Sequence, residues 1–346
     1  MVAAQVAKIV PRPRFAVLGT IAALVALALY GVTPFGAIDL SIGAVLGVGV
    51  GLVVPARTIT DRRVLALAAV GAAAALVNLR LAAAVVVVSA VITIATHRGT
   101  RERVDRRAIA VVTLGALLGG GLVLWVGGND PTVQWFGHVI THGDRGDRRV
   151  ALTFDDGPDD PYSLQVSAIL DQHGAKGTFF EVGKAIDARP AIAKALYADG
   201  HLLGNHSYHH DYWRWLDPRY PELDRTQDAF RQQLGVCPAF FRPPHGQRTP
   251  FMLAHASDKN MVTVTWDVSA QDWSATDGAE VARRILEHVQ PGSIILLHDG
   301  IDGTVTADRT VLLEALPLIL DGLASKGLHP VRLDELLGRA GYLDHC

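Results

Sequence analysis

Cysteine is scarce in this chain, which has only Cys237 and Cys346 among its 346 residues. Neither cysteine lies in a CxxC or comparable ligand spacing, which argues against a zinc site built on thiolates. The two could form a disulfide if their domain lies outside the cell, but we favour a small buried cysteine and a loose C-terminal one. The chain also lacks an excess of charge of either sign, because its formal net charge is −2. A nearly neutral chain gives no indication of nucleic acid as a partner.

Charged residues are sparse in the first third of the chain, where Ala, Val, Leu and Gly predominate. A helix needs about 20 apolar residues to span a bilayer. Five apolar runs come near or reach this length, at residues 15–34, 37–54, 64–79, 81–96 and 108–126. The third and fourth are short, so they form either a tight helical hairpin or one poorly divided segment.

Clusters of basic residues occupy every second connection between the apolar runs, and this pattern predicts the orientation of the region in the membrane. Lys and Arg clusters precede the first run and separate the second from the third and the fourth from the fifth. By the positive-inside rule all three clusters face the cytoplasm. This predicts five spans in the bilayer, a cytoplasmic N-terminus and everything after about Gly127 outside the cell. Four spans would break the pattern of basic loops.

A cleaved signal peptide is the alternative for the first run. That run is longer than the apolar core of about 7–15 residues of such peptides, and further spans follow it. The predicted spans contain no chain of acidic or His residues of the kind that marks transport. We therefore interpret residues 1–127 as a membrane anchor, with a transporter or flippase as the alternative.

Residues 128–148 are rich in Gly, Asp, Asn and His and are predicted to be a linker. From residue 149 to 346, strand-like and helix-like segments alternate, which predicts an α/β domain with a mainly parallel sheet, open or closed into a barrel. Strands are expected at residues 149–154, 177–182, 239–241, 262–266, 293–297 and 330–332. Helices are expected at residues 163–173, 190–198, 221–234, 251–259, 278–289 and 309–326.

Two adjacent carboxylates, Asp155 and Asp156, end the first of these strands and are followed by a Gly-Pro turn. Adjacent residues that leave a strand point in different directions. One carboxylate could hold a metal while the other acts on the water that the metal activates. The competing interpretation is a pair of turn aspartates, which the same segment would also satisfy.

Five segments of this part resemble, in order, the motifs of the NodB-type polysaccharide deacetylases, carbohydrate esterase family 4. They are TFDDGP (153–158), HSYHH (206–210), RPPHG (242–246), DW (272–273) and LLH (296–298). The resemblance covers about residues 149–337 and not the apolar region. It implies a distorted (β/α) barrel with fewer than eight strands, a divalent metal, and removal of acetyl groups from a sugar polymer.

The residues themselves also favour a metal site. His206 and His210 are four apart, so on a helical turn both imidazoles would face the same way. With Asp156 they make a set of two histidines and one carboxylate, which suits a catalytic Zn²⁺ with an open position. Co²⁺ or another divalent ion is the alternative. His209 competes with His210, and the family spacing favours His210.

The resemblance implies roles for the remaining motif residues. Asp155 is the general base, Arg242 holds it, and His298 is the general acid, whose pKa Asp272 raises. The backbone N–H of His245 stabilises the oxyanion, although the family usually has an aromatic residue such as Tyr there. Trp273 and Leu296 resemble the walls of the acetyl methyl pocket. Trp213 and Trp215 could stack on sugar rings or could pack within their loop.

We therefore predict a metal-dependent deacetylase that acts on an acetylated polysaccharide next to the membrane. Peptidoglycan is the polymer nearest to a membrane-anchored domain, so its N-acetylglucosamine or N-acetylmuramic acid residues are the first expected substrate. A chitin-like polymer or acetyl-xylan is the alternative. A non-catalytic glycan-binding module with the same fold is the alternative of a different class.

Overall fold

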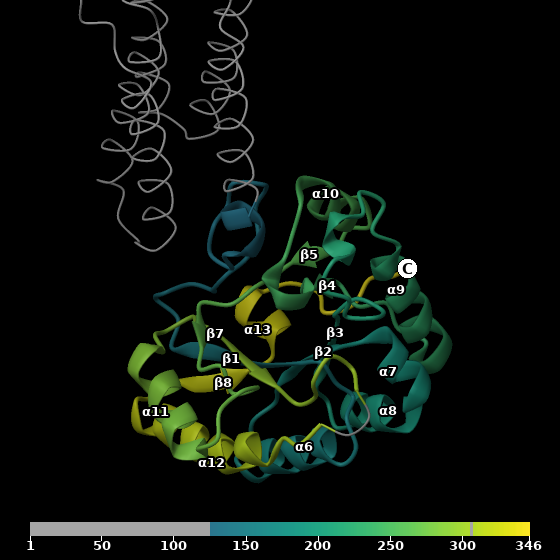
Figure 1. The fold of residues 1–346 in the computed structure, drawn as a ribbon. Coiled ribbons are helices and arrows are strands. Elements are labelled where there is room, and N and C mark those ends of the chain that lie inside the picture. Colours follow the sequence, from purple (N-terminus) through teal and green to yellow (C-terminus); the bar gives the residue numbers. More distant parts are fainter. Residues whose placement is uncertain (1–124, 305–306) are drawn as a thin grey trace, which may run out of the picture. The chain divides into compact units, whose positions relative to one another are not determined.

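The computed structural model describes residues 125–304 and 307–346 of the chain (Figure 1). Residues Gly127–Cys346 form one compact unit. In that described part, no helix is long and apolar enough to cross a membrane. The five predicted spans lie outside the described residues, except for Trp125 and Val126 at the end of the fifth. The membrane region therefore stays a prediction.

One parallel sheet of eight strands organises the unit. The strands are β1 (Arg149–Asp155), β2 (Thr178–Glu181), β3 (Leu202–Asn205), β4 (Phe240–Phe241), β5 (Val262–Thr263), β6 (Val268–Ser269), β7 (Ile294–His298) and β8 (His329–Val331). Their order is β5-β4-β3-β2-β1-β7-β6. Strand β8 pairs with the first half of β1, whereas β2 pairs with its second half. The sheet is a curled (β/α) half-barrel, as the resemblance implies.

Helices connect most of the strands (Figure 1). They are α6 (Tyr162–Gln172), α7 (Gly183–Ala188), α8 (Pro190–Ala198), α9 (Pro221–Leu234), α10 (Pro250–Asp258), α11 (Gly278–His288), α12 (Thr310–Ser325) and α13 (Leu333–Leu337), with short 3₁₀ turns η2 (Arg214–Leu216) and η3 (Pro244–Gly246). Helices α6, α8, α11 and α12 cover the outer face of the sheet, whereas α13 packs on the inner one. Helices α11, α12, α6 and α8 each contact the next in that order. Because the strands are parallel, all their carboxyl ends lie at one edge of the sheet.

The alternation of side chains along β1 decides which residues reach the inside of the half-barrel. Leu152 and Phe154 pack into the larger apolar core with the covering helices, whereas Ala151 packs into the inner one. Asp155 follows Ala151 by four residues and therefore lies on the inner face. Strand β7 pairs with β1 in a register that places His298 beside Asp155.

Several sequence predictions about elements are wrong. The sheet has eight strands, whereas the resemblance implied fewer than eight. Of these strands, β3 and β6 were not predicted. Strand β6 has two residues and β3 contains a glycine, so neither gives a clear periodic pattern. Helix α7 was also missed. The segment from His206 to His210 is a loop and not a helical turn.

Residues 128–148, predicted as a linker, lie against the domain. Val139 is buried, and Ile140 pairs with Val264 in a parallel bridge. The N–H of Gly143 donates to the carbonyl oxygen of Gly292 at 2.7 Å. Although its composition is typical of a loop, this segment is packed against the unit along a defined path.

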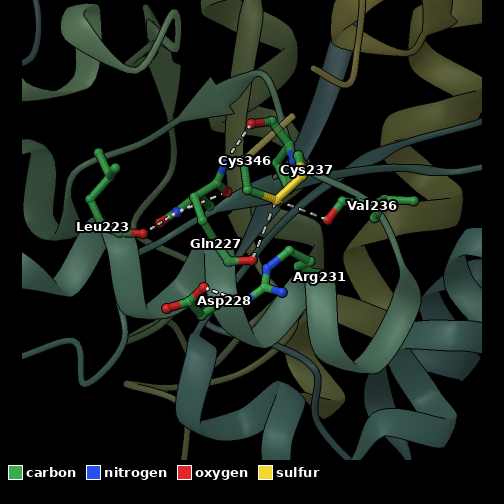
Figure 2. Close-up of a disulfide and its surroundings, with 9 residues drawn as sticks. Leu223, Gln227, Asp228, Arg231, Val236, Cys237 and Cys346 are labelled. Atoms are coloured by element: carbon green, nitrogen blue, oxygen red, sulfur yellow. Dashed lines mark hydrogen bonds and ion pairs between the residues drawn. A yellow bond between two sulfur atoms is a disulfide. The ribbon is translucent and has the colours of Figure 1, made fainter. Parts of the chain in front are cut away.

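The preference for two unpaired cysteines is wrong, because Cys237 and Cys346 form a disulfide (Figure 2). The C-terminal segment runs beside the residues that precede β4, and the N–H of Leu343 donates to the carbonyl oxygen of Cys237 at 2.8 Å. This pairing brings the two Cα atoms to 5.2 Å, although 109 residues separate them in sequence. Such a long-range contact leaves no spacing signal in the sequence.

Candidate metal centre and active site

The predicted metal ligands meet at the carboxyl edge of the sheet. Asp156 follows β1, and His206 and His210 lie in the loop after β3. The Asp156 Oδ1 atom lies 3.4 Å from His206 Nε2 and 3.0 Å from His210 Nε2. All three residues are buried, and their ligand atoms lie within 4.8 Å of one another. The two imidazoles thus converge on one carboxylate oxygen without a helix to align them.

The loop conformations that produce this convergence are unusual for non-glycine residues. Asp156 has a φ of 80°, Ser207 of 68° and His210 of 57°. Such left-handed conformations are costly and persist where the surrounding structure holds them, often at functional sites. Here the Ser207 hydroxyl accepts from the His210 N–H at 3.1 Å. The turn at Asp156 separates its side chain from that of Asp155.

Each histidine is held through its other ring nitrogen. His206 Nδ1 donates to the carbonyl oxygen of Arg242 at 2.8 Å. His210 Nδ1 lies 2.8 Å from Asp302 Oδ1, an ion-pair contact that lacks hydrogen-bond geometry. Partners of this kind fix the tautomer and leave Nε2 free for a metal. His209 does not compete, because its backbone N–H and its ring Nδ1 both lie 2.9 Å from the buried Glu222.

The donor set fits a divalent cation. Asp156 Oδ1 is buried without a hydrogen-bond partner in the described part of the chain, as expected for an oxygen that faces a cation. Burial raises the pKa of Asp156, but the charge of His210 and the close approach of both imidazoles outweigh it and hold that pKa well below its usual range. Burial lowers the pKa of His210, and Asp156 and Asp302 outweigh that effect and raise it to about 10. The pocket therefore favours positive charge.

Asp155 lies between Arg242 and His206, and its closest contact is to Arg242. Its Oδ1 accepts from Arg242 Nη1 at 2.7 Å, whereas its Oδ2 lies 3.6 Å from His206 Nε2. Arg242 is fully buried, with its guanidinium 4.2 Å from the ring centre of Phe180. It also donates to Thr153 Oγ1 at 2.8 Å. Burial lowers the Arg242 pKa and Asp155 opposes this, so the pair is held as a buried ion pair.

His298 occupies the other side of Asp155, at the end of β7. Its Nδ1 donates to Asp272 Oδ1 at 2.9 Å, and its backbone N–H donates to Asp272 Oδ2 at 3.0 Å. Arg309, which the sequence analysis did not single out, donates to Asp272 Oδ2 at 2.7 Å and to the His298 carbonyl oxygen at 2.9 Å. Burial lowers the pKa of His298, but Asp272 outweighs it and raises the pKa to about 9.

The three residues predicted to contact the substrate lie near this centre. His245 has a φ of 55° in η3, and its ring centre lies 4.7 Å from that of His210. No hydrogen bond engages the His245 N–H among the described residues. Leu296 is buried on the same face of β7 as His298, and Trp273 is exposed in the loop after β6. Burial beside His210 and His206 lowers the pKa of His245 to about 4.

Two buried carboxylates that were not predicted, Glu181 and Asp299, lie next to Gly157. A Cβ atom at Gly157 would approach Glu181 Oε2 within 2.8 Å and would overlap Asp299 Oδ2. Burial raises the pKa of Glu181 well above its usual range and that of Asp299 to about 7. The Ser163 hydroxyl donates to Asp299. The turn after Asp156 thus requires glycine because these side chains fill the space beside it.

Sequence reasoning missed Asp302 and Arg309 as partners of the site. Asp302 is an exposed loop residue 92 positions from His210, and Arg309 follows a loop without a motif. Neither shows a spacing that relates it to its partner. Only the fold brings them to the carboxyl edge.

The family described as polysaccharide deacetylase matches residues 142–270. A peptidoglycan-N-acetylglucosamine deacetylase of Bacillus cereus is 32% identical over 189 residues, which are 54% of this chain and 67% of that protein. The crystal structure of the Bc1960 peptidoglycan N-acetylglucosamine deacetylase matches with a TM-score of 0.55 and 30% identity, over 59% of this chain and 94% of that one.

The fold also occurs in a protein described as a pseudoenzyme. The structure of a carbohydrate esterase family 4 pseudoenzyme from Bacillus anthracis matches with a TM-score of 0.53 and 25% identity, over 59% of this chain and 71% of that one. Fold alone therefore does not establish turnover. The matched sequences and the residues gathered at the carboxyl edge agree on one assignment. The chain belongs to the polysaccharide deacetylases of carbohydrate esterase family 4 and is a deacetylase.

Proposed function

We propose that this chain is a metal-dependent N-deacetylase of peptidoglycan that acts outside the cell from a membrane anchor. One observation carries the chemistry: the ligand set Asp156, His206 and His210 lies beside the Asp155–Arg242 ion pair and the His298–Asp272 pair at a single edge of the sheet. A hydrolase that splits an amide needs a base for water and an acid for the leaving nitrogen, and this edge offers both.

The three ligands would hold a divalent cation, most simply Zn²⁺, which acts as a Lewis acid on the acetyl carbonyl and lowers the pKa of water. Asp155 is the base in this proposal. Its Oδ1 is occupied by Arg242, so Oδ2, which faces His206, is the atom that takes the proton from the attacking water. Arg242 fixes the orientation of Asp155 through its hydrogen bond to Oδ1.

His298 is the acid. Its Nδ1 proton is engaged by Asp272, so Nε2 is the atom that donates to the leaving nitrogen. The raised pKa keeps this imidazole protonated at neutral pH. The backbone N–H of His245 would stabilise the oxyanion as the carbonyl becomes tetrahedral. Trp273 and Leu296 would enclose the acetyl methyl group.

Two lines of support favour the peptidoglycan polymer. The relatives described above include deacetylases named for peptidoglycan N-acetylglucosamine. The disulfide between Cys237 and Cys346 is typical of proteins in oxidising compartments. Together with the predicted spans, this favours a catalytic unit outside the cell, next to the wall. N-acetylglucosamine residues are the first substrate, and N-acetylmuramic acid is the second.

The proposal is tested by measuring acetate release from peptidoglycan, N-acetylglucosamine oligomers and acetyl-xylan with the zinc-loaded chain. We expect release from peptidoglycan that a chelator abolishes. Asp155→Asn should keep its zinc and lose turnover, because it retains the ligands and loses the base. Asp160→Asn is the matched control, an exposed turn residue five positions away. Normal turnover by Asp155→Asn would refute the mechanism, and a zinc-loaded chain that binds glycan without releasing acetate would support a binding module instead.

A further inference from the structure

A row of aromatic rings runs from the candidate metal centre to the surface. It begins at His206 and His210, whose ring centres lie 5.0 Å apart, and continues to His245 at 4.7 Å from His210. Tyr212 follows at 5.1 Å from His245, and Trp213 at 5.0 Å from Tyr212. Consecutive spacings of this size are contacts between rings. The row therefore links the buried ligands to the exposed loop after β3 without a gap.

The outer end of this row is open to solvent. Tyr212 is 41% exposed and Trp213 is 62% exposed. Large exposed aromatic side chains that adjoin one another form an apolar patch, and such patches mark binding surfaces. No side-chain hydrogen bond engages the Tyr212 hydroxyl or the Trp213 ring nitrogen within the described residues. Both polar tips are therefore available to a ligand.

The loop that carries Trp213 is anchored to the domain by neighbouring residues. Two residues further on, Trp215 is buried at 7% exposure and packs with Tyr220 and Met252 in an apolar cluster. The N–H of Trp213 donates to Asp211 Oδ1 at 3.0 Å. The two tryptophans thus divide the roles that the sequence left open: Trp215 anchors the loop, and Trp213 is directed outward.

We propose that Tyr212 and Trp213 form a sugar-binding subsite that holds the pyranose next to the one being deacetylated. This inference rests on the proposed function, because it takes the polysaccharide substrate as the occupant. A pyranose has apolar C–H faces that stack on aromatic rings and hydroxyl groups that pair with a phenol or an indole N–H. The patch offers both, and its contact with His245 makes it continuous with the reacting centre.

The sheet order shows on which side this subsite lies. The loop after β3 carries Tyr212 and Trp213, and the loop after β6 carries Trp273. Four strand intervals separate β3 from β6, with β1 between them. At about 4.8 Å per interval the path along the curled sheet between these two strands is about 19 Å, so the two loops rise from well-separated strands. A chain bound there extends beyond the target sugar on the β3 side.

The subsite is tested with the full-length chain, loaded with zinc, on N-acetylglucosamine tetramers and dimers. Trp213→Ala should raise the KM for the tetramer by about tenfold, with a much smaller fall in kcat. Because a dimer reaches the subsite in fewer registers, its KM should change less. Trp213→Phe should restore most of the lost affinity, since it keeps an aromatic face.

The matched control is Tyr197→Ala. Tyr197 is also 41% exposed, but it lies at the end of α8, just before β3 begins, and so at the opposite edge of the sheet. This variant should behave as the wild type does. An unchanged tetramer KM in Trp213→Ala, or an equal rise in Tyr197→Ala, would overturn the inference.

Failure of the inference and failure of the proposed function give different results. If the wild type releases acetate and Trp213→Ala matches it on both oligomers, only the subsite is wrong. If the wild type releases no acetate, the proposed function is wrong, and tetramer affinity measured by calorimetry then tests the subsite alone. Equal affinity for wild type and Trp213→Ala in that measurement would overturn the subsite, and a loss of affinity would support it.

Discussion

Replacing Asp272 with Asn should shift the pH dependence of turnover. Asp272 accepts from His298 Nδ1 at 2.9 Å and is the strongest influence that raises the His298 pKa to about 9 against the effect of burial. His298 donates a proton in the proposed mechanism, so it is competent below its pKa, and activity falls as the pH rises through it. The wild type should therefore lose activity near pH 9, or somewhat below it when a bound cation offsets Asp155 and Asp156.

The size of the effect follows from the two pKa values. Without the Asp272 charge, burial leaves the His298 pKa at or below the ordinary value of about 6.5. At pH 8 about 90% of the imidazole is then protonated in the wild type and about 3% in Asp272→Asn, a difference of about thirtyfold. At pH 5.5 both proteins are mostly protonated, so the difference should shrink. Asn keeps an oxygen that can accept from Arg309, which limits structural loss.

The assay is the initial rate of acetate release at low substrate, followed from pH 5.5 to 10 with saturating zinc. Asp308→Asn is the control, because this exposed aspartate lies in the same loop as Arg309 and bonds to Thr310 rather than to His298. Its alkaline limb should match that of the wild type. If Asp272→Asn lowers the rate by the same factor at every pH, and its rate falls at the same alkaline pH as that of the wild type, Asp272 does not act through the His298 pKa.

Three further predictions concern the ion pair, the metal and the disulfide. Arg242→Met leaves the buried Asp155 carboxylate without its closest cation, so the free energy of unfolding should fall by about 3–5 kcal/mol in urea; the double variant with Asp155→Asn should recover part of it, and no recovery would contradict the pairing. Asp302→Ala should weaken zinc affinity by about 10- to 100-fold in a chelator competition, because it removes the oxygen that faces His210 Nδ1, and unchanged affinity would remove Asp302 from the site. Reducing the Cys237–Cys346 bond, which spans 109 residues, should lower the free energy of unfolding by about 2–5 kcal/mol, and equal urea midpoints with and without reductant would contradict this.

The fold and the candidate metal centre could be predicted from the sequence to different extents. The apolar run of β1 and the regular helices were predictable because periodicity is local. The motif residues were predictable because their types and order repeat a known pattern. The partners Asp302 and Arg309 and the disulfide were not, because each contact joins distant segments through the tertiary fold. Short strands such as β6 contain too few residues for an alternating apolar pattern to be recognised.

The histidine loop shows the same limit at a single site. The spacing of His206 and His210 predicted that they share one face, and their Nε2 atoms do approach the same oxygen of Asp156. The predicted reason was a helical turn, whereas the structure uses left-handed backbone at Ser207 and His210. Residue spacing thus indicated the partners and not the local conformation that brings them together.

Locating a bound cation by anomalous diffraction at the zinc edge is the most direct test of the account, since every proposed role depends on the metal centre. Crystals of the zinc-loaded protein should show one strong peak about 2.0–2.2 Å from Asp156 Oδ1, His206 Nε2 and His210 Nε2. The Asp155 carboxylate should remain on Arg242. A peak elsewhere, or a peak that Asp155 ligates while Asp156 does not, would contradict the assignment of ligand and base.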